Sequence, residues 1–158
     1  MQAGIITISD RASSGVYEDL GGPALEQAAA GYGGGGIASA IVPDEGSRIQ
    51  EAILSFNAQG CGLILTTGGT GVAGRDVTPE AIREIMRVEI PGFGEIMRAR
   101  SFEITPNAIL SRCLGAIVRT SLVLALPGKP KGAVECLGFV RGAIDHTVKV
   151  AQQIPTSC

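Results

Sequence analysis

The segment from Thr66 to Gly71 reads Thr-Thr-Gly-Gly-Thr-Gly, which places three glycines within four positions. Because glycine carries no side chain, successive backbone N–H groups of such a segment can point at one anion. Phosphate or pyrophosphate is the kind of anion that this arrangement suits. The same composition is also typical of an ordinary tight turn. Taken alone, the segment predicts either an anion-binding loop or a structural turn.

Two aspartates in separate loops are candidates for metal binding. Asp44 follows the apolar run Ile37–Val42, and Asp76 follows the glycine-rich segment. Enzymes that act on phosphates commonly hold Mg²⁺ with one or two carboxylates together with phosphate oxygens of the substrate. A single acidic residue in a loop is more often solvated or caps a helix. Beside a phosphate-binding segment, however, the pair predicts catalytic carboxylates that bind Mg²⁺.

Two segments of the sequence resemble nucleotide-binding motifs only in part. The segment 69–74 contains G-x-G-x-x-G after an apolar run, a pattern that would indicate a nicotinamide-dependent oxidoreductase. That fingerprint opens directly into a helix, whereas further residues precede the helix expected at Thr78. A P-loop is excluded because Gly128-Lys129 is followed by proline rather than by serine or threonine. A nucleotide, if bound, would therefore be held by a different geometry.

The elements that position these residues follow from apolar runs and their spacing. Runs interpreted as strands are Ile5–Ile8, Ile37–Val42, Leu63–Leu65 and Leu122–Leu126, the last in a hairpin around Arg119, Thr120 and Ser121. Helices are expected from Pro23 to Ala30, from Ser47 and Thr78 as N-caps, and from Pro130 through Val148. Strands that alternate with helices predict a single α/β domain over residues 1–158 with a mainly parallel sheet.

Each expected strand ends in a segment of glycine, proline, small hydroxyls or aspartate. If the strands are parallel, these segments lie at one edge of the sheet, where α/β proteins bind ligands. The last segment, 127–130, leads into the N-terminus of the final helix, which favours anions. Lys129 would add a positive charge there, although a turn with a solvated lysine also explains this segment.

Composition bears on compartment and partners. The chain has 158 residues, 18% of them charged, and a formal net charge of -2 without a basic run, so we expect no nucleic-acid partner. The low charged share suits a surface that partner subunits partly cover. The first apolar run is too short for a signal sequence or a membrane span, so we expect a cytoplasmic protein. Scattered cysteines and the single His146 form no thiolate or imidazole metal motif.

The chain combines the glycine-rich segment at 66–71 with Arg-Asp-Val-Thr-Pro-Glu at 75–80. It also contains characteristic segments at 9–15, 43–45, 91–95, 110–112 and 126–128. In combination they resemble the MogA-type molybdopterin adenylyltransferases, relatives of the G domain of gephyrin and of plant molybdenum-insertion proteins. The resemblance runs from about Gly4 to the last helix. The pairing of segments 66–71 and 75–80 is its most specific part.

This resemblance implies a three-layer α/β/α domain of the molybdopterin-binding type that assembles as a homotrimer. It implies transfer of AMP from Mg-ATP to the phosphate of molybdopterin, with release of pyrophosphate, in molybdenum cofactor biosynthesis. Asp76 corresponds to the essential aspartate of the family near metal and phosphates, and Asp44 to its acidic partner. A molybdenum-insertion protein is a further expected partner. The residues expected to contact substrate are Ser9, Asp10, Ser13, Thr67, Gly68, Gly69, Thr70, Gly71, Ser101, Pro127 and Gly128.

Two positions depart from the family pattern. Ala125 stands where adenylyltransferase members often carry asparagine, so one polar contact is expected to be missing, and Lys129 stands where an uncharged residue is common. MoaB-type relatives share the loops. The resemblance therefore leaves a second hypothesis, a trimeric scaffold that binds molybdopterin without ATP turnover, and Ala125 favours it.

Overall fold

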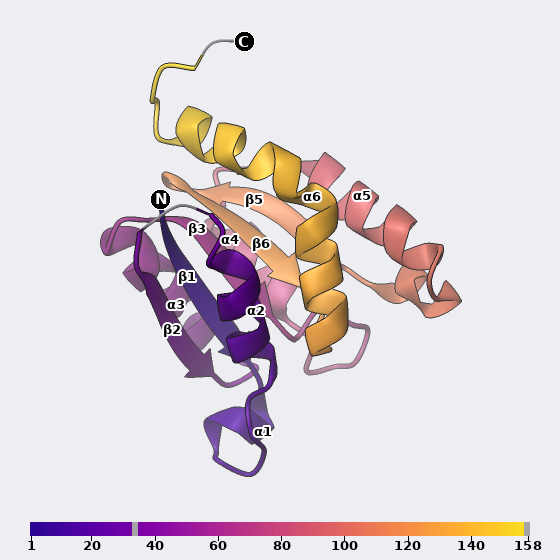
Figure 1. The fold of residues 1–158 in the computed structure, drawn as a ribbon. Helices are drawn as coiled ribbons and strands as arrows, with labels where there is room; N and C mark the ends of the chain where they lie inside the picture. Colours follow the sequence, from indigo (N-terminus) through magenta and orange to yellow (C-terminus); the bar gives the residue numbers. More distant parts are fainter. Residues whose placement is uncertain (33–34, 157–158) are drawn as a thin grey trace.

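The structure of the protein, a computed structural model, describes residues 1–32 and 35–156. Within these residues the chain forms a six-stranded sheet in the order β2-β1-β3-β6-β5-β4 (Figure 1). β1, β2, β3 and β6 are parallel, whereas β5 is antiparallel to both of its neighbours, so the predicted mainly parallel sheet is confirmed. The strands are β1 (Gln2–Ile8), β2 (Ile37–Val42), β3 (Cys61–Thr67), β4 (Val88–Glu89), β5 (Leu114–Val118) and β6 (Ser121–Leu126).

Helices cover both faces of this sheet. The helices are α1 (Asp10–Ser13), α2 (Gly21–Ala29), α3 (Gly46–Ala58), α4 (Thr78–Ile85), α5 (Pro91–Phe102) and α6 (Pro130–Ala151), with a 3-10 helix, η1 (Pro106–Leu110). Helices α2, α5 and α6 share one apolar core with the sheet, and α3 and α4 share another. In Figure 1, α2 and α6 cross the near face of the sheet and α3 lies behind it. Among helices of the described residues, none is both long and apolar enough to cross a membrane.

Strand β3 shows why the sheet has a layer on each side. All of its residues are buried. Leu63 and Leu65 belong to the core under α2, α5 and α6, whereas Ile64 belongs to the core under α3 and α4. Since successive side chains of a strand point to opposite faces, a continuous apolar run needs cover on both. The three-layer α/β/α architecture implied by the resemblance is therefore confirmed.

The four apolar runs interpreted as strands all form strands, and they are the four parallel ones. Their carboxyl ends consequently lie at one edge of the sheet. The predicted hairpin is also confirmed, since β5 and β6 pair across Arg119 and Thr120. Arg119 has a φ of 53°. Strand β4 was not predicted, because a two-residue strand carries no periodic signal.

Two predicted helix caps are wrong. Helix α3 begins at Gly46, one residue before Ser47, and no side chain caps its end. Thr78 is the first residue of α4 rather than its N-cap, and its hydroxyl donates to the Gly68 carbonyl oxygen at 2.9 Å. That hydroxyl is engaged by a neighbouring loop, which local sequence patterns do not reveal. Pro130 is the first residue of α6, as predicted.

Burial predicts different energetic roles for two isoleucines of the sheet. Ile64 in β3 is fully buried, whereas Ile41 in the edge strand β2 is 46% exposed. We predict that Ile64→Ala lowers the free energy of unfolding by about 2–5 kcal/mol, because it removes apolar contacts and leaves a cavity. The matched truncation Ile41→Ala is expected to cost less than about 1 kcal/mol. Chemical denaturation followed by circular dichroism measures both, and equal losses would contradict this assignment.

Candidate functional site

Polar loops gather at the edge of the sheet where β1, β2, β3 and β6 end, near α1 in Figure 1. A cavity of about 600 Å³ opens beside the loops that follow β3 and β6, and it extends to α5 and η1. A second cavity of about 300 Å³ adjoins it. Gly128 and Lys129 line both cavities. The edge therefore offers two adjacent spaces that share a wall.

Residues 68–71, named here the glycine loop, leave the end of β3. Gly68 and Gly69 have φ angles of 107° and 63°, in the left-handed region that side chains disfavour. A Cβ atom at Gly68 would collide with the carbonyl oxygen of Ile8, and one at Gly69 would collide with the hydroxyl of Thr78. Both conformation and space therefore require glycine at these positions.

All four carbonyl groups of the glycine loop accept hydrogen bonds from two residues outside it. Thr78 donates to the first two carbonyls, through its hydroxyl at 2.9 Å and its amide at 3.1 Å. Arg112 donates to the last two, through its amide at 2.9 Å and its guanidinium Nε at 2.7 Å. Hydrogen bonds to its carbonyl oxygens therefore hold the loop in place. The backbone N–H groups of Gly69, Thr70 and Gly71 are not used for this.

Three backbone N–H groups of the glycine loop belong to residues that line the larger cavity. Within the described part of the chain, the N–H groups of Gly69, Thr70 and Gly71 donate to no protein acceptor, and all three residues line this cavity. Adjacent backbone donors of this kind bind anions. Lys129 and Lys131, at the start of the 22-residue helix α6, line the same cavity. The arrangement suits a phosphate or a pyrophosphate.

Arg112 has a role in the site that the sequence analysis missed. Its guanidinium also donates to the backbone oxygen of Asp76 and pairs with the carboxylate of Glu80. One side chain therefore connects the glycine loop, the aspartate that follows it and helix α4. Segment 110–112, one of the segments that match the family, contains this arginine. The match did not predict its function, because the residues that it binds are distant in sequence.

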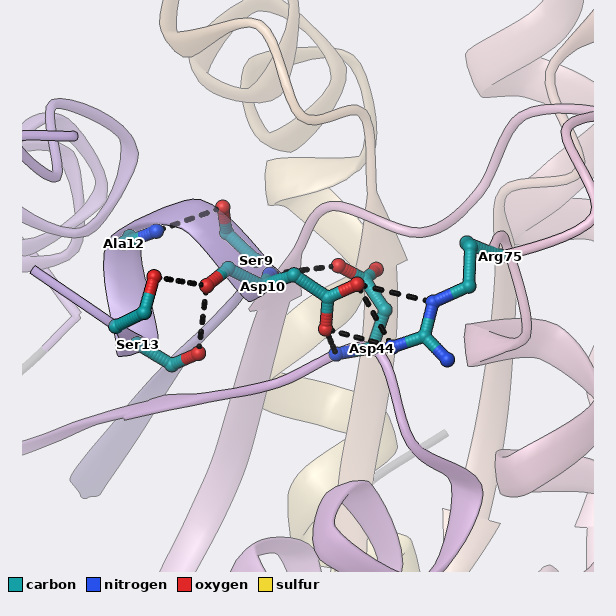
Figure 2. A network of polar contacts seen from close by, with 7 residues as sticks. Ser9, Asp10, Ala12, Ser13, Asp44 and Arg75 are labelled. Carbon is teal, nitrogen blue, oxygen red and sulfur yellow. Dashed lines mark hydrogen bonds and ion pairs between the residues drawn. The ribbon is translucent and has the colours of Figure 1, made fainter. Parts of the chain in front are cut away.

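Asp10 and Asp44, just beyond the ends of β1 and β2, form reciprocal hydrogen bonds between backbone amides and side-chain carboxylates (Figure 2). The Asp10 amide donates to Asp44 Oδ2, and the Asp44 amide donates to Asp10 Oδ1, each at 2.9 Å. Arg75 donates to both carboxylate oxygens of Asp10 at 2.7 Å. This hydrogen bonding with Arg75 is the largest cause that lowers the pKa of Asp10. Asp10 is therefore a charged residue whose carboxylate is already engaged.

Asp44 is the less satisfied of these two carboxylates. Partial burial is the largest cause that raises its pKa, and the negative charges of Asp10 and Asp76 raise it further. The Asp10 amide and the Arg75 charge oppose this shift. An additional positive charge beside Asp44 would lower the pKa again, which is the behaviour expected of a metal ligand.

Asp44 and Asp76 flank the glycine loop. A Cβ atom at Gly69 would lie 3.2 Å from Asp44 Oδ1, and one at Gly71 would lie 2.7 Å from Asp76 Oδ2. One oxygen of each carboxylate accepts a backbone amide, from Asp10 at 2.9 Å and from Ala73 at 2.8 Å. The other oxygens are hard donors that fit Mg²⁺.

These two carboxylates do not form a complete metal site by themselves. In residues 1–32 and 35–156, no group of three or more His, Cys, Asp or Glu side chains is placed to hold a metal ion. A cation between Asp44 and Asp76 would therefore take its remaining ligands from phosphate oxygens or water, as Mg²⁺ commonly does. The donor chemistry of the two carboxylates suits such a shared site.

The predicted substrate residues divide among three places. Ser9 and Ser13 make local hydrogen bonds in and beside α1, to the Ala12 amide at 3.2 Å and the Asp10 carbonyl at 3.1 Å (Figure 2). Asp10, Ser13 and Asp44 line neither of the two cavities described. The larger cavity is lined by Gly69, Thr70, Gly71, Asp76, Ser101, Pro127 and Gly128, and the smaller one by Ser9, Thr67, Gly68 and Gly128.

Ala125 does not face the substrate edge. Its side chain is fully buried in the core under α3 and α4, and its register partner in β3 is Thr66. The Thr66 hydroxyl is buried without a hydrogen-bond partner among the described residues. An asparagine at this position would thus extend into the packing behind the glycine loop. The alanine changes that packing rather than the lining of either cavity.

A family model described as "Probable molybdopterin binding domain" matches residues 4–146. The protein belongs to this family. Its curated relatives include proteins named molybdopterin adenylyltransferase, from Helicobacter pylori strain J99 (44% identical, covering 92% of this chain and 84% of that protein) and Escherichia coli strain K12 (44% identical, covering 94% and 77%).

Solved structures of the same fold agree with this assignment. The molybdopterin biosynthesis enzyme MoaB from Thermus thermophilus has a TM-score of 0.88 and 39% identity, with 99% of both chains covered. A structure of MogA has a TM-score of 0.88 and 30% identity, covering 98% of this chain and 100% of that one. The architecture is therefore shared over nearly the whole chain.

The glycine loop offers a test with a matched control. Gly69→Ala would place a Cβ against the Thr78 hydroxyl at a strained φ of 63°. We predict that this substitution weakens binding of inorganic pyrophosphate about tenfold or more, because it costs about one charge-assisted hydrogen bond to the anion. Gly74→Ala is the control, because a Cβ there meets nothing within 4 Å. Isothermal titration calorimetry measures both affinities, and equal values would contradict an anion site at the loop.

Arg112 is expected to position the glycine loop through its fork of donors. Arg112→Lys keeps the charge but cannot reproduce the bonds to Gly71, Asp76 and Glu80 together. We predict about tenfold weaker pyrophosphate binding for this variant. Arg48→Lys, in an exposed ion pair on α3, should leave the affinity unchanged. If Arg112→Lys binds like wild type in the same titration, the loop does not depend on the guanidinium.

Proposed function

We propose that this protein is a molybdopterin adenylyltransferase, which transfers AMP from ATP to the phosphate of molybdopterin and releases pyrophosphate. The observation that carries the proposal is the glycine loop, whose four carbonyls all accept hydrogen bonds from Thr78 and Arg112. Among the described residues, the N–H groups of Gly69, Thr70 and Gly71 have no protein acceptor, and these three residues line the larger cavity. Adjacent backbone N–H groups without a protein acceptor suit the negatively charged oxygens of a phosphate-bearing ligand. The name of the curated relatives at 44% identity supports this choice of reaction.

Two adjoining cavities suit a reaction between two phosphate-bearing substrates. Gly128 and Lys129 form their shared wall, immediately before the N-terminus of α6. The larger cavity combines apolar side chains, such as Met97 and Ile104, with the hydroxyl of Ser101. A flat heterocycle with a few polar groups fits such a lining. The phosphates of both substrates would then meet at the glycine loop.

The chemistry is an in-line displacement at phosphorus. An oxygen of the molybdopterin phosphate attacks the α-phosphorus of ATP and forms a new P–O bond. The bond from that phosphorus to the oxygen that bridges to the β-phosphate breaks, and pyrophosphate leaves. The chain contributes position and charge rather than a nucleophile. The loop N–H groups and Lys129 offset the negative charge at the transferring phosphate.

Asp44 and Asp76 are the residues that would hold Mg²⁺ in this proposal. Bound Mg²⁺ supplies charge neutralisation between the two phosphate-bearing substrates and orients their oxygens. Asp10 positions Asp44 through the reciprocal backbone bonds at 2.9 Å, and Arg75 keeps Asp10 charged. Asp10 is therefore a positioning residue, whereas Asp44 and Asp76 act at the phosphates.

We further propose a cytoplasmic homotrimer that delivers its product to a molybdenum-insertion protein. Three buried cysteines of the described chain are free thiols, which suits a reducing compartment. The low charged fraction of 18% and exposed apolar side chains such as Phe102 and Val150 support contact between subunits. The non-catalytic scaffold loses its main support, because Ala125 lies in the core and not in a cavity.

Pyrophosphate release tests the proposed reaction. We predict release from ATP that requires both molybdopterin and Mg²⁺, and a loss of about 100-fold or more in Asp76→Asn. Asp145→Asn is the matched control, because Asp145 pairs with Lys149 at 2.6 Å on α6 and lines neither cavity. Molybdopterin binding without release in wild type would support the scaffold instead. Circular dichroism of each variant separates loss of catalysis from loss of folding.

A further inference from the structure

Glu135 is an acidic residue of the larger cavity that the reaction described above does not use. It lies in α6 and lines the cavity together with Met97 and Ser101 of α5. The residue after it, Cys136, lines the same cavity, and its Sγ lies 3.5 Å from Ser101 Oγ. Asp76, the other acidic residue of the lining, follows the glycine loop. Glu135 therefore places a carboxylate in the part of the cavity next to α5.

The carboxylate of Glu135 has only a weak partner within the protein. In the described part of the chain, its one ion pair is with Lys131, whose Nζ lies 3.8 Å from Glu135 Oε1. This separation is longer than a hydrogen bond. The Lys131 side chain is 85% exposed, and the Glu135 side chain is 32% exposed. Because an ion pair with a solvated lysine contributes little free energy, the carboxylate is available to a ligand that carries hydrogen-bond donors.

Glu135 is separated along α6 from the glycine loop. A Cβ atom at Gly128 would lie 3.3 Å from the Cα atom of Gly68, so the residues just before α6 pack against that loop. Helix α6 begins at Pro130. By the rise of an α-helix, Glu135 lies about 7.5 Å further along the axis. The cavity thus combines backbone donors at one end with a carboxylate acceptor at a distance from them.

A carboxylate binds best to two adjacent N–H donors, because each of its oxygens then accepts one charge-assisted hydrogen bond. The pyrimidine ring of a pterin carries such a pair, the N3–H group and the amino group at C2. Adenine carries no such pair, since the N1 nitrogen beside its amino group is an acceptor. A carboxylate in this cavity therefore favours a pterin over an adenine.

We propose that Glu135 is a specificity-determining residue, whose carboxylate accepts hydrogen bonds from the N3–H and 2-amino groups of the pterin while the phosphate of the same ligand lies at the glycine loop. This assignment rests on the proposed function, since it takes molybdopterin as the ligand of the larger cavity. It also disfavours the adenine of ATP in this cavity, because the N1 lone pair of adenine would lie against a negative charge.

Exchange of one group on the ligand and one on the protein tests this recognition. Neopterin monophosphate carries the 2-amino group and a phosphate, and its lumazine analogue carries an oxygen at C2 instead. We expect the wild type to bind the pterin about tenfold more tightly than the analogue, because an oxygen at C2 would oppose the carboxylate. In Glu135→Gln the side-chain amide can donate to that oxygen, so this preference is expected to be lost. Isothermal titration calorimetry measures the four affinities.

A neighbouring glutamate provides the matched control. Glu103 makes an exposed ion pair with Arg100 at 3.7 Å and lines neither cavity, so Glu103→Gln should keep the wild-type preference. The affinity for inorganic pyrophosphate should be equal in wild type and Glu135→Gln, since that ligand needs only the glycine loop. A general loss of folding would lower both affinities together. An unchanged preference in Glu135→Gln, or a wild type that binds both pteridines equally, overturns the proposal.

This test is separable from the adenylyl-transfer assay because binding requires no ATP. A preference that depends on Glu135, in a wild type that releases no pyrophosphate, contradicts the transfer and supports the recognition. Pyrophosphate release together with a preference that Glu135→Gln leaves intact contradicts the recognition alone. A wild type that binds no phosphorylated pterin overturns the recognition in either case.

Discussion

The site depends on one constraint, the pairing of backbone polar groups at the end of β3. A loop at the edge of a buried sheet must satisfy its carbonyls and amides, because unpaired buried groups are costly. In this protein Thr78 and Arg112 satisfy the carbonyls of the glycine loop, whereas the amides of Gly69, Thr70 and Gly71, which line the larger cavity, have no acceptor among the described residues. A ligand with negatively charged oxygens would complete the pairing. The proposed anion binding therefore rests on how the loop is anchored, and not on its glycine content alone.

The parallel part of the sheet is what brings the anchors to the loop. Because β1, β2, β3 and β6 run in one direction, their following segments meet at one edge. Strand β5 runs the other way, so its N-terminal end lies near the carboxyl ends of its neighbours, and this delivers Arg112 to the glycine loop. The close approach of Ile8 and Thr78 then leaves no room for a Cβ atom at Gly68 or Gly69. The reversal of one strand thus completes a site that the parallel strands begin.

Asp10 and Asp44 are both aspartates, but their surroundings give them different roles. Asp10 pairs with Arg75 and forms reciprocal amide–carboxylate hydrogen bonds with Asp44. The pKa of Asp44 is raised because burial and neighbouring negative charges disfavour its ionised form. This is unfavourable for the ligand-free protein and favourable for binding a cation together with phosphate. The same edge thus has backbone donors suited to an anion and carboxylates suited to a cation. Such a site needs few charged side chains, because backbone N–H groups supply part of the charge compensation. This agrees with the low share of charged residues in the sequence.

The sequence by itself determined the layers, the four parallel strands, the start of α6 and the glycine loop, because apolar periodicity and glycine chemistry are local signals. It also identified the family, since segments 66–71 and 75–80 occur together. Only the tertiary structure decided that Thr78 binds the loop instead of capping a helix, that Arg112 anchors it, and that Arg75 engages Asp10. Only the fold, likewise, placed Ala125 in the core. These contacts join residues as far as 65 positions apart, and no local pattern reports which partners the packed layers will bring together.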